Sequence, residues 1–373
     1  MLRFLTSGES HGKCLVAILE GMVAGLPLDL QKINHELYRR QFGYGRGGRM
    51  QIEKDRVEIL SGVRSKETIG GPIALEIQNK DFKIDELPVV KRPRPGHADL
   101  VGVLKYGRSD IRDVLERASA RETAARVAVG GICRQFLAAF GVDLLSHVIE
   151  IGGVRVPVGP LSFQKIRRAS EKSPVRCAYP SVTKRMMKKI DQIKKAKDTV
   201  GGIVENQVQG VVPGIGSFAQ YDERLDARLA FVLMSIQAVK GVEIGLGFEV
   251  ARTDGSGAHD EIFYNRAKKK YFRHTNRAGG IEGGMSNGST LILRAATKPY
   301  STLMKPLRSV HIDSKRIEKA TVQRSDVTAV PACGVVGEAM VAFELAKCYL
   351  EKFGGDSLKE THRNFYAYMK RLS

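Results

Sequence analysis

The 373-residue chain contains no tryptophan, and its five cysteines include no C-x-x-C pair. Their odd number and wide spacing argue against a disulfide framework and against a zinc site, so we expect reduced cysteines and no essential structural metal. No stretch is long and apolar enough to span a bilayer, because charged residues or glycines interrupt every candidate. The first residues also lack the apolar core of a signal peptide. These absences favour a soluble, cytoplasmic protein.

The net charge of +20 has two competing explanations. Binding to nucleic acid would account for it through neutralisation of phosphates. An anionic substrate together with an anionic cofactor would account for it equally well. A basic block at residues 165–197 has the character of a solvated helix face. Because the chain has no basic-aromatic interleaving, nucleic acid is the weaker of the two explanations.

Periodicity predicts a mixture of helices and antiparallel strands. Helices are expected at residues 119–141, where Ser119 and Glu122 form a capping box, at about 226–240 and at about 336–353. Strand-like alternation occurs at residues 56–63 and 290–296. No regular β-α-β rhythm, repeat or linker is present, which predicts an α+β fold in one domain over residues 1–373, with a basic helical segment at about 163–198.

The segment at residues 276–290, N-R-A-G-G-I-E-G-G-M-S-N-G-S-T, is unusually rich in glycine. Glycine loses more conformational entropy on folding than other residues, so close approach of the backbone to a flat or anionic ligand is one explanation. A tight turn between strands is the other.

Two histidines are predicted to lie in turns. His11 follows Ser10 between Gly8 and Gly12, and since G-x-S-x-G is absent we interpret His11 as a general acid or base rather than part of a hydrolase triad. His97 lies in the stiff segment R-P-R-P-G-H-A-D, where neighbouring cations are expected to lower its pKa. A turn histidine without a catalytic role, for His11, and a structural histidine bonded to Asp99, for His97, remain the alternatives.

Several arginine and lysine segments are suited to anions. Four arginines occur among glycines at residues 39–50, without a nearby acid in the sequence, and guanidinium groups grip carboxylates and phosphates bidentately. The helix start near Ser119 offers free backbone N–H groups beside Arg117 and Arg121. Lys298 is followed by two hydroxyl side chains, and Arg324 lies close to Asp326. The corresponding structural explanations are a flexible loop for residues 39–50, an ordinary helix cap for the segment near Ser119 and a local salt bridge for Arg324 and Asp326.

Six of these segments, taken together and in this order, closely resemble chorismate synthase. They are residues 8–12 (GESHG), 43–50 (GYGRGGRM), 94–99 (RPGHAD), 119–123 (SARET), 278–284 (AGGIEGG) and 324–326 (RSD). The resemblance extends from the first ten residues to about Gly355. It implies a β-α-β sandwich of mixed antiparallel sheets and helices, and a homotetramer.

The resemblance also implies the reaction. The family catalyses the last step of the shikimate pathway, in which 5-enolpyruvylshikimate 3-phosphate loses phosphate and a ring hydrogen in a 1,4-elimination to give chorismate. Reduced FMN is required although no net redox change occurs, and a flavin electron is thought to assist departure of the phosphate and then to return. Substrate and cofactor together carry enough negative charge to explain the basic chain. NADPH as a reductant for the flavin is left open.

Roles are implied residue by residue. His11 would donate a proton to the leaving phosphate with Ser10 in a relay, His97 would protonate or hydrogen-bond the reduced flavin near N1, and Asp326 would help to remove the ring hydrogen. Substrate anions would be held by Arg40, Arg46 and Arg49. The flavin site would comprise Arg117, Ala118, Ser119, Gln237, Ala238, Gly283, Lys298, Pro299, Tyr300, Ser301, Thr302 and Arg324. Gln237 and Ala118 depart from the asparagine and serine more frequent at these positions.

Overall fold

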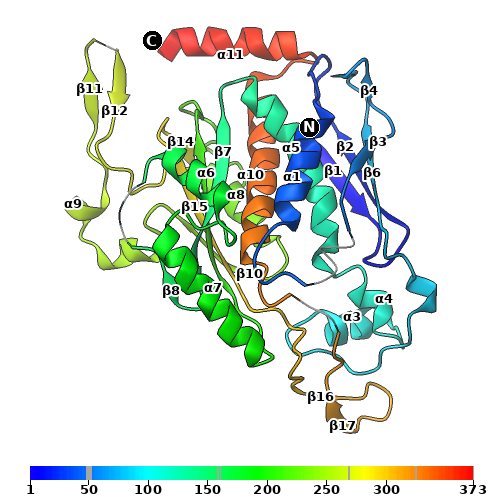
Figure 1. Cartoon of the computed structure of the whole chain (residues 1–373). Helices are drawn as coiled ribbons and strands as arrows, with labels where there is room; N and C mark the ends of the chain where they lie inside the picture. The colour runs from blue at the N-terminus through cyan, green and yellow to red at the C-terminus, as the bar shows by residue number, and fades with distance from the viewer. Residues whose placement is uncertain (48–52, 158, 160, 268, 324–325, 373) are drawn as a thin grey trace.

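Two antiparallel sheets enclose a layer of helices (Figure 1). The structure, a computed structural model, describes residues 1–47, 53–157, 159, 161–267, 269–323 and 326–372. The strand order of the first sheet is β1 (Arg3–Ser7), β2 (Cys14–Glu20), β6 (Ile73–Gln78) and β3 (Val57–Ile59). That of the second is β10 (Val239–Ile244), β15 (Leu291–Thr297), β9 (Gly202–Gln209), β7 (Asp143–Ile151) and β8 (Val154–Arg155).

Alternating apolar residues direct one face of each sheet toward the helices. Leu15, Ala17 and Leu19 of β2 are buried, as are Leu291, Leu293 and Ala295 of β15. The helical layer consists of α1 (Leu30–Gln41), α5 (Thr123–Ala138), α8 (Leu225–Met234) and α10 (Val330–Phe353). The helices α5 and α10 approach closely because Gly130 has no side chain, and a Cβ atom there would overlap Ala339. One hydrophobic cluster extends from Leu2 to Phe365.

A buried carboxylate on α10 ties the helical layer together. Glu338 accepts hydrogen bonds from Arg39 of α1 at 2.8 Å and from Arg134 of α5 at 2.5 Å. Arg176 lies 3.5 Å from the same carboxylate. Burial alone would raise the pKa of Glu338, but the positive charges of Arg39, Arg134 and Arg176 lower it well below its ordinary value. Glu338 is therefore ionised and fully paired inside the protein.

The remaining elements cover the outside of the sandwich. The helices are α3 (Asp99–Tyr106), α4 (Arg112–Leu115), α6 (Phe163–Lys172), α7 (Pro180–Lys195), α9 (Gly255–Ala258) and α11 (Leu358–Leu372), with 3₁₀ turns at Ile84–Glu86, Ala120–Glu122 and Gly247–Arg252. The hairpins are β4 (Val63–Arg64) with β5 (Glu67–Thr68), β11 (Phe263–Asn265) with β12 (Lys270–Phe272), β13 (Ile281–Glu282) with β14 (Met285–Ser286), and β16 (Arg308–Val310) with β17 (Ile317–Lys319). Among the described residues, no helix combines the length and hydropathy needed to cross a membrane.

The predicted α+β class with mixed antiparallel sheets is confirmed, and three local predictions need correction. The helix expected at 226–240 ends at Met234, because Ala238 adopts a left-handed φ of 71° and the next residues pair with β15. The last expected helix begins earlier, at Val330, with Pro331 tolerated in its first turn. The strand expected at 56–63 is divided between β3 and β4.

Candidate active site

His11 lies in the turn between β1 and β2 and is paired with a buried carboxylate. Its Nδ1 atom is 2.9 Å from Oε2 of Glu116, and its backbone N–H donates to the same oxygen. Burial alone would raise the pKa of Glu116, but the hydrogen bonds from His11 and the charge of Arg112 lower it. A carboxylate that accepts from Nδ1 orients the ring and fixes its tautomer. Nε2, on the opposite side of the ring, lies 3.8 Å from Asp81.

Ser10 connects this turn to the start of α5. Its hydroxyl accepts a hydrogen bond from Ser119 at 3.3 Å, and its backbone N–H donates to the carbonyl of Glu116 at 3.0 Å. Ser119 also accepts from the backbone of Arg121 as the cap of the 3₁₀ turn. The predicted capping box is wrong in its second half, because Glu122 bonds Thr6, Arg126 and Gln237 instead.

His97 has a matching arrangement at the start of α3. Its Nδ1 atom lies 2.6 Å from Oδ1 of Asp99, whose other oxygen accepts from Arg94 at 2.8 Å. Arg94 in turn donates to the hydroxyl of Thr302 at 2.8 Å. Burial alone would raise the pKa of Asp99, but the hydrogen bonds from His97 and Arg94 hold it well below its ordinary value. The bond to Asp99 that was foreseen as a structural alternative is present, and it is also the geometry that orients a catalytic histidine.

The loop after β15 carries the predicted run from Lys298 to Thr302 up to His97. The Lys298 ammonium and the Ser301 hydroxyl both donate to the carbonyl of Gly96, the residue before His97. Burial, together with the like charge of Lys240, lowers the pKa of Lys298. Pro299 lies beside Gly201. A Cβ atom added to Gly201 would lie 3.1 Å from the backbone nitrogen of Pro299.

Tyr300 lies near Asp326, the predicted base, and Arg46, which is predicted to bind the substrate. Burial and the negative charge of Asp326 raise the pKa of Tyr300 to about 12, so the phenol is neutral at physiological pH. Asp326 itself is 2.9 Å from Nη1 of Arg46 and accepts from the backbone N–H of Gly47. Arg46 and Asp326, distant in the sequence, are thus in direct contact.

Arg40, predicted to clamp the substrate, points into the protein. Its guanidinium donates to Thr123 at 2.9 Å, Asp55 at 3.2 Å and the carbonyl of Ala120 at 3.2 Å. Burial lowers the pKa of Arg40 to about 10, against the attraction of Asp55. The premise that the arginines at 39–50 lack acidic partners is wrong. The fold supplies Glu338 to Arg39, Asp55 to Arg40 and Asp326 to Arg46.

Continuous contacts join the predicted flavin residues that precede α5 with those that precede β10. Arg117 donates to the carbonyl and hydroxyl of Thr6, and the Thr6 hydroxyl donates to Glu122. Gln237 donates to the other oxygen of Glu122 at 3.0 Å. The carbonyl of Ala238 accepts from the backbone of Lys298 at 2.9 Å, which closes the connection to the His97 loop. Ala118 lies in the same turn as Arg117, where its backbone N–H donates to Val114.

One predicted residue within the described part of the chain, Gly283, stands apart from this set. Gly283 is in the two-residue turn between β13 and β14, beside the first residue of α8, since Leu225 donates to the carbonyl of Gly284. Gln237 follows the opposite end of α8, and a ten-residue helix is about 15 Å long. The tight-turn explanation of the glycine-rich segment therefore describes its local structure. Arg49 and Arg324 lie outside the described residues.

The residues present suit a flavin phosphate and ring system. Lys298 and Arg117 supply cationic donors for an anion. Within the described part of the chain, no group donates to the buried Oε1 atom of Gln237, which could accept a hydrogen bond from a flavin ring N–H. Ala238, next to it, adopts a left-handed φ, so backbone strain is also concentrated there. The described residues contain no cluster of His, Cys, Asp and Glu that could hold a metal.

Sequence reasoning missed the role of two carboxylates next to the predicted residues. Glu116 orients His11, and Glu122 connects Thr6, Arg126 and Gln237. Glu116 immediately precedes the Arg117-Ala118-Ser119 segment, and this adjacency was the available signal.

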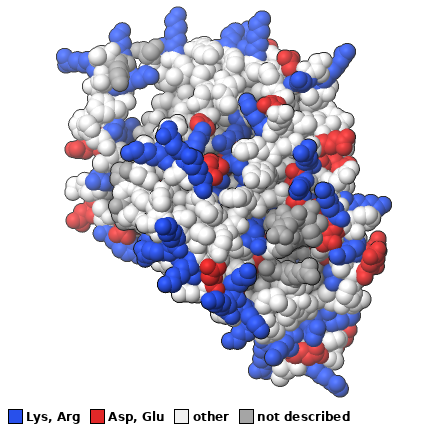
Figure 2. All heavy atoms as spheres, viewed as in Figure 1, with Lys and Arg blue, Asp and Glu red and all other residues white. Residues whose placement is uncertain are grey.

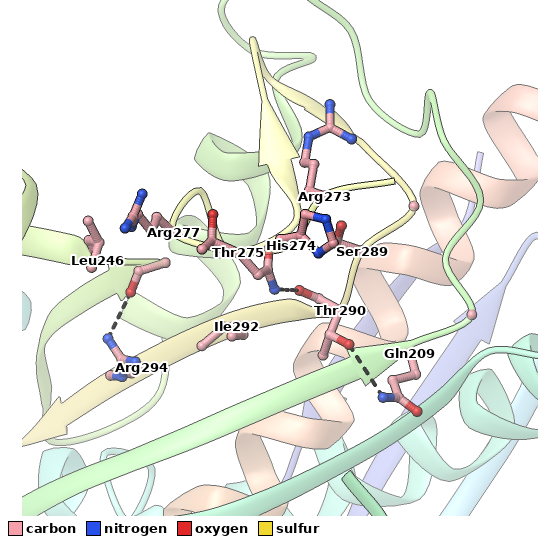
Figure 3. A pocket seen from close by; sticks show the side chains of 14 residues that line it. Gln209, Leu246, Arg273, His274, Thr275, Arg277, Ser289, Thr290, Ile292 and Arg294 are labelled. Atoms are coloured by element: carbon pink, nitrogen blue, oxygen red, sulfur yellow. Dashed lines mark hydrogen bonds between the residues drawn. The ribbon is translucent and has the colours of Figure 1, made fainter. Parts of the chain in front are cut away.

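A cavity of about 820 Å³ lies elsewhere, on the outer face of β9 and β15 (Figure 3). Asn276, Arg277, Ser289 and Thr290 of the glycine-rich segment line it. Its arginines already have partners, for example Arg294, which donates to Glu205 and to the carbonyl of Gly245. The two histidine–carboxylate pairs are not part of its wall, so the candidate site at the histidines and this cavity are separate.

Comparison with known proteins gives a consistent result. The family model described as chorismate synthase matches residues 2–350. A chorismate synthase of Pelobacter propionicus is 54% identical and one of Geobacter metallireducens is 52% identical, each aligned over 100% of this chain and 99% of the relative. A crystal structure of chorismate synthase superposes with a TM-score of 0.83 at 44% identity, over 100% of this chain and 98% of that one.

Proposed function

Because this chain belongs to the chorismate synthase family of shikimate-pathway lyases, we propose that it converts 5-enolpyruvylshikimate 3-phosphate into chorismate with reduced FMN as cofactor. The reaction is a 1,4-elimination of phosphate and a ring hydrogen without net redox change. The product would feed aromatic amino acid biosynthesis in the cytoplasm. The observation that supports the proposal most directly is the pairing of two histidines with buried carboxylates, His11 with Glu116 and His97 with Asp99, next to a set of cations.

His11 is proposed to protonate the leaving phosphate. Its Nδ1–H is committed to Glu116, so a proton would leave from Nε2, and Ser10 and Ser119 would form the adjoining relay. An ionised Glu116 stabilises the protonated imidazole before transfer and keeps the ring oriented after it.

Substrate anions are proposed to bind near Arg46, together with Arg49. Arg46 has an exposed fraction of 9% in its side chain and is held by Asp326, so its guanidinium is already oriented before a ligand arrives. Arg40 is proposed to act mainly through its charge and by positioning Asp55 and the turn at Ala120. Asp326 is proposed to help remove the ring hydrogen, and its contacts with Arg46 and Gly47 hold its carboxylate in place.

Reduced FMN is proposed to lie between Arg117, Ala118, Ser119, Gln237, Ala238, the loop from Lys298 to Thr302 and Arg324, with Gly283 also contributing. When bound, it would supply an electron transiently to the elimination. His97 would hold or exchange a proton at the flavin through Nε2, since its Nδ1 is bonded to Asp99. Arg94 fixes this arrangement by bridging Asp99 and Thr302.

Binding to nucleic acid, the alternative based on charge, has less support. Lys and Arg on the face in Figure 2 occur in separate groups with uncharged surface between them. Many arginines are paired internally, including Arg39, Arg134 and Arg176 around Glu338. A stripe of unpaired cations, as phosphate backbones require, is not what this face presents.

Anaerobic turnover tests the proposed function. With chemically reduced FMN, we expect one phosphate and one chorismate per substrate consumed and no net oxidation of the flavin. Stoichiometric oxidation of FMN would instead indicate a flavin reductase. Repeating the assay with oxidised FMN and NADPH determines whether the chain reduces its own flavin. Light scattering tests the homotetramer that family membership leads us to propose.

A further inference from the structure

The C-terminal half of α7 lies against the loop that leads to the proposed substrate site. Asp191 of this helix accepts a hydrogen bond from the hydroxyl of Tyr44 at 2.8 Å. A Cβ atom added to Gly45 would lie 3.0 Å from the side chain of Ile190, so helix and loop are in close contact. Gly45 immediately precedes Arg46, which is proposed to bind substrate anions. This helix therefore borders the proposed substrate site.

The residues that follow α7 contact a second loop of the site. The hydroxyl of Thr199 donates to the carbonyl of Tyr300 at 2.7 Å, and the backbone N–H of Lys305 donates to the carbonyl of Lys197 at 3.0 Å. In Figure 1, the lower end of α7 accordingly lies beside the segment that runs from β15 to β16. The end of α7 thus borders both the loop before Arg46 and the loop that carries Tyr300.

Four exposed lysines are gathered at this edge, namely Lys194, Lys195, Lys197 and Lys305. We name them the α7 rim. In the described part of the chain, none of them forms an ion pair with a carboxylate. The two acids nearest to them in the sequence, Asp191 and Asp198, accept hydrogen bonds from a phenol and from a backbone N–H instead. Positive charge therefore predominates at the edge of the site.

Two members of the α7 rim are unfavourable for folding. Lys197 has a left-handed φ of 59° and follows the helix cap, where Asp198 donates to the carbonyl of Ile193 at 3.1 Å. Glycine is the usual residue at this position of such a cap, because it adopts a left-handed conformation without strain. Lys305 is held beside Lys197 by the backbone hydrogen bond, although their like charges repel. Stability of the fold therefore gives no reason for a lysine at either position.

We propose that the α7 rim attracts the anionic substrate toward the Arg46 site and raises its rate of association. The inference rests on the proposed function, since 5-enolpyruvylshikimate 3-phosphate carries a phosphate and two carboxylates. Charges of one sign grouped at a binding site raise association rates by about 10- to 1,000-fold, and the effect falls steeply with ionic strength. The α7 rim is separate from the proposed catalytic residues, so it acts on capture of the substrate and leaves the chemical step unchanged.

The double variant Lys197→Gln/Lys305→Gln tests the proposal. Stopped-flow absorbance of oxidised FMN follows binding of the substrate to the protein–flavin complex. At 0.01 M ionic strength, we expect an association rate constant about three- to tenfold below that of the wild type, with the dissociation rate constant nearly unchanged. At 1 M the difference should disappear, because the Debye length falls from about 30 Å to about 3 Å. A wild-type association rate at low ionic strength overturns the proposal.

Two control variants separate local charge from other effects. Lys359→Gln/Arg363→Gln removes two exposed cations of α11, which lies at the opposite end of the molecule from α7 (Figure 1). This variant should associate with the substrate at close to the wild-type rate, and an equal loss would assign the effect to net charge instead of the α7 rim. Lys197→Arg/Lys305→Arg retains both charges and should retain the rate. A slow arginine variant would likewise contradict attraction by charge.

The single variant Lys197→Gly separates capture from folding. Glycine relieves the left-handed strain, so we expect a higher thermal midpoint together with slower association of the substrate at low ionic strength. A lower midpoint would show that the lysine is required by the fold, against the proposal. Slower association of FMN, with that of the substrate unchanged, would assign the α7 rim to the cofactor and also overturn it.

Steady-state turnover distinguishes this proposal from the proposed function. At low ionic strength, Lys197→Gln/Lys305→Gln should lower kcat/KM about three- to tenfold and leave kcat unchanged. Failure of the wild type to form chorismate would reject the proposed function. Normal wild-type turnover with an unchanged kcat/KM in the double variant would reject the role of the α7 rim alone.

Discussion

Nδ1 of His97 lies 2.6 Å from Oδ1 of Asp99, and Nδ1 of His11 lies 2.9 Å from Oε2 of Glu116. Each histidine thus has one nitrogen fixed by a buried carboxylate, while its Nε2 atom lies near a second charged group, Asp81 at 3.8 Å for His11 and Arg94 at 3.5 Å for His97. Two such pairs in one connected set suit a reaction that moves protons at two places.

Asp99→Asn should reduce turnover by about two to four orders of magnitude, because an amide no longer imposes the tautomer of His97. Since both residues act as a unit, adding His97→Ala should cost little more. Single-turnover rates of Asp99→Asn, His97→Ala and the double variant test this. Thermal unfolding is the control, because Asp99→Asn also removes the carboxylate that pairs with Arg94. If the two losses of turnover add, the two residues act independently.

His11→Ala should lower turnover by about two to four orders of magnitude if His11 is a general acid. Glu116→Gln should leave residual activity but move the pH profile of kcat to lower pH, because the protonated imidazole loses its carboxylate. Near wild-type turnover for His11→Ala would remove it from the mechanism. An unchanged pH profile for Glu116→Gln would show that Glu116 has only a structural role.

Arg40→Ala should destabilise the fold by about 3–5 kcal/mol, because it leaves the buried Asp55 without one of its two cations. Arg46→Ala, nearer to solvent, should instead weaken substrate affinity with a smaller loss of stability. Urea unfolding and equilibrium binding of the substrate measure both properties for each variant. Equal losses of stability would show that Arg46 contributes as much to the stability of the fold as Arg40 does.

Gly283→Ala should cost about 1–2 kcal/mol, the cost of a left-handed backbone for an L-residue, because its φ is 56° and a Cβ atom there meets nothing within 4 Å. Gly284→Ala is the matched comparison and should cost more, since its Cβ would lie 2.8 Å from Arg224 and from the carbonyl of Ser217. Denaturant midpoints give the ranking. FMN affinity of Gly283→Ala then shows whether the turn also contacts the flavin, and unchanged affinity would assign it to the fold alone.

Glu205 should make stability depend on acid pH. Burial alone would raise its pKa, but the hydrogen bond from His147 and the charge of Arg294 lower it to about 2. With the folded pKa below the ordinary value of 4.5, its contribution is complete above pH 4.5 and is lost as pH falls toward 2. Glu205→Gln should therefore be less stable than the wild type at pH 7, with the difference shrinking toward pH 2. A constant difference in unfolding free energy would contradict this.

The fold class could be predicted from the sequence, as could the segments proposed to carry the chemistry. Turns around His11 and His97 can be recognised from local glycine and proline, because those residues restrict the backbone within a few positions. The alternation at β15 and the period of α5 are likewise local, and both elements lie close to their expected places.

Only the tertiary structure decided which charges are paired. Arg39, Arg40 and Arg46 are near neighbours in the sequence, yet they contact Glu338, Asp55 and Asp326 respectively, and two of these acids come from the far end of the chain. The end of α8 was also decided by pairing, since residues after Ala238 gain ladder hydrogen bonds with β15. Ion pairs and strand pairs depend on distances between remote segments, whereas periodicity and turn residues act within a few residues. The motifs could therefore be found in the sequence, as could Asp99 beside His97, but Glu116, the carboxylate that orients His11, required the fold.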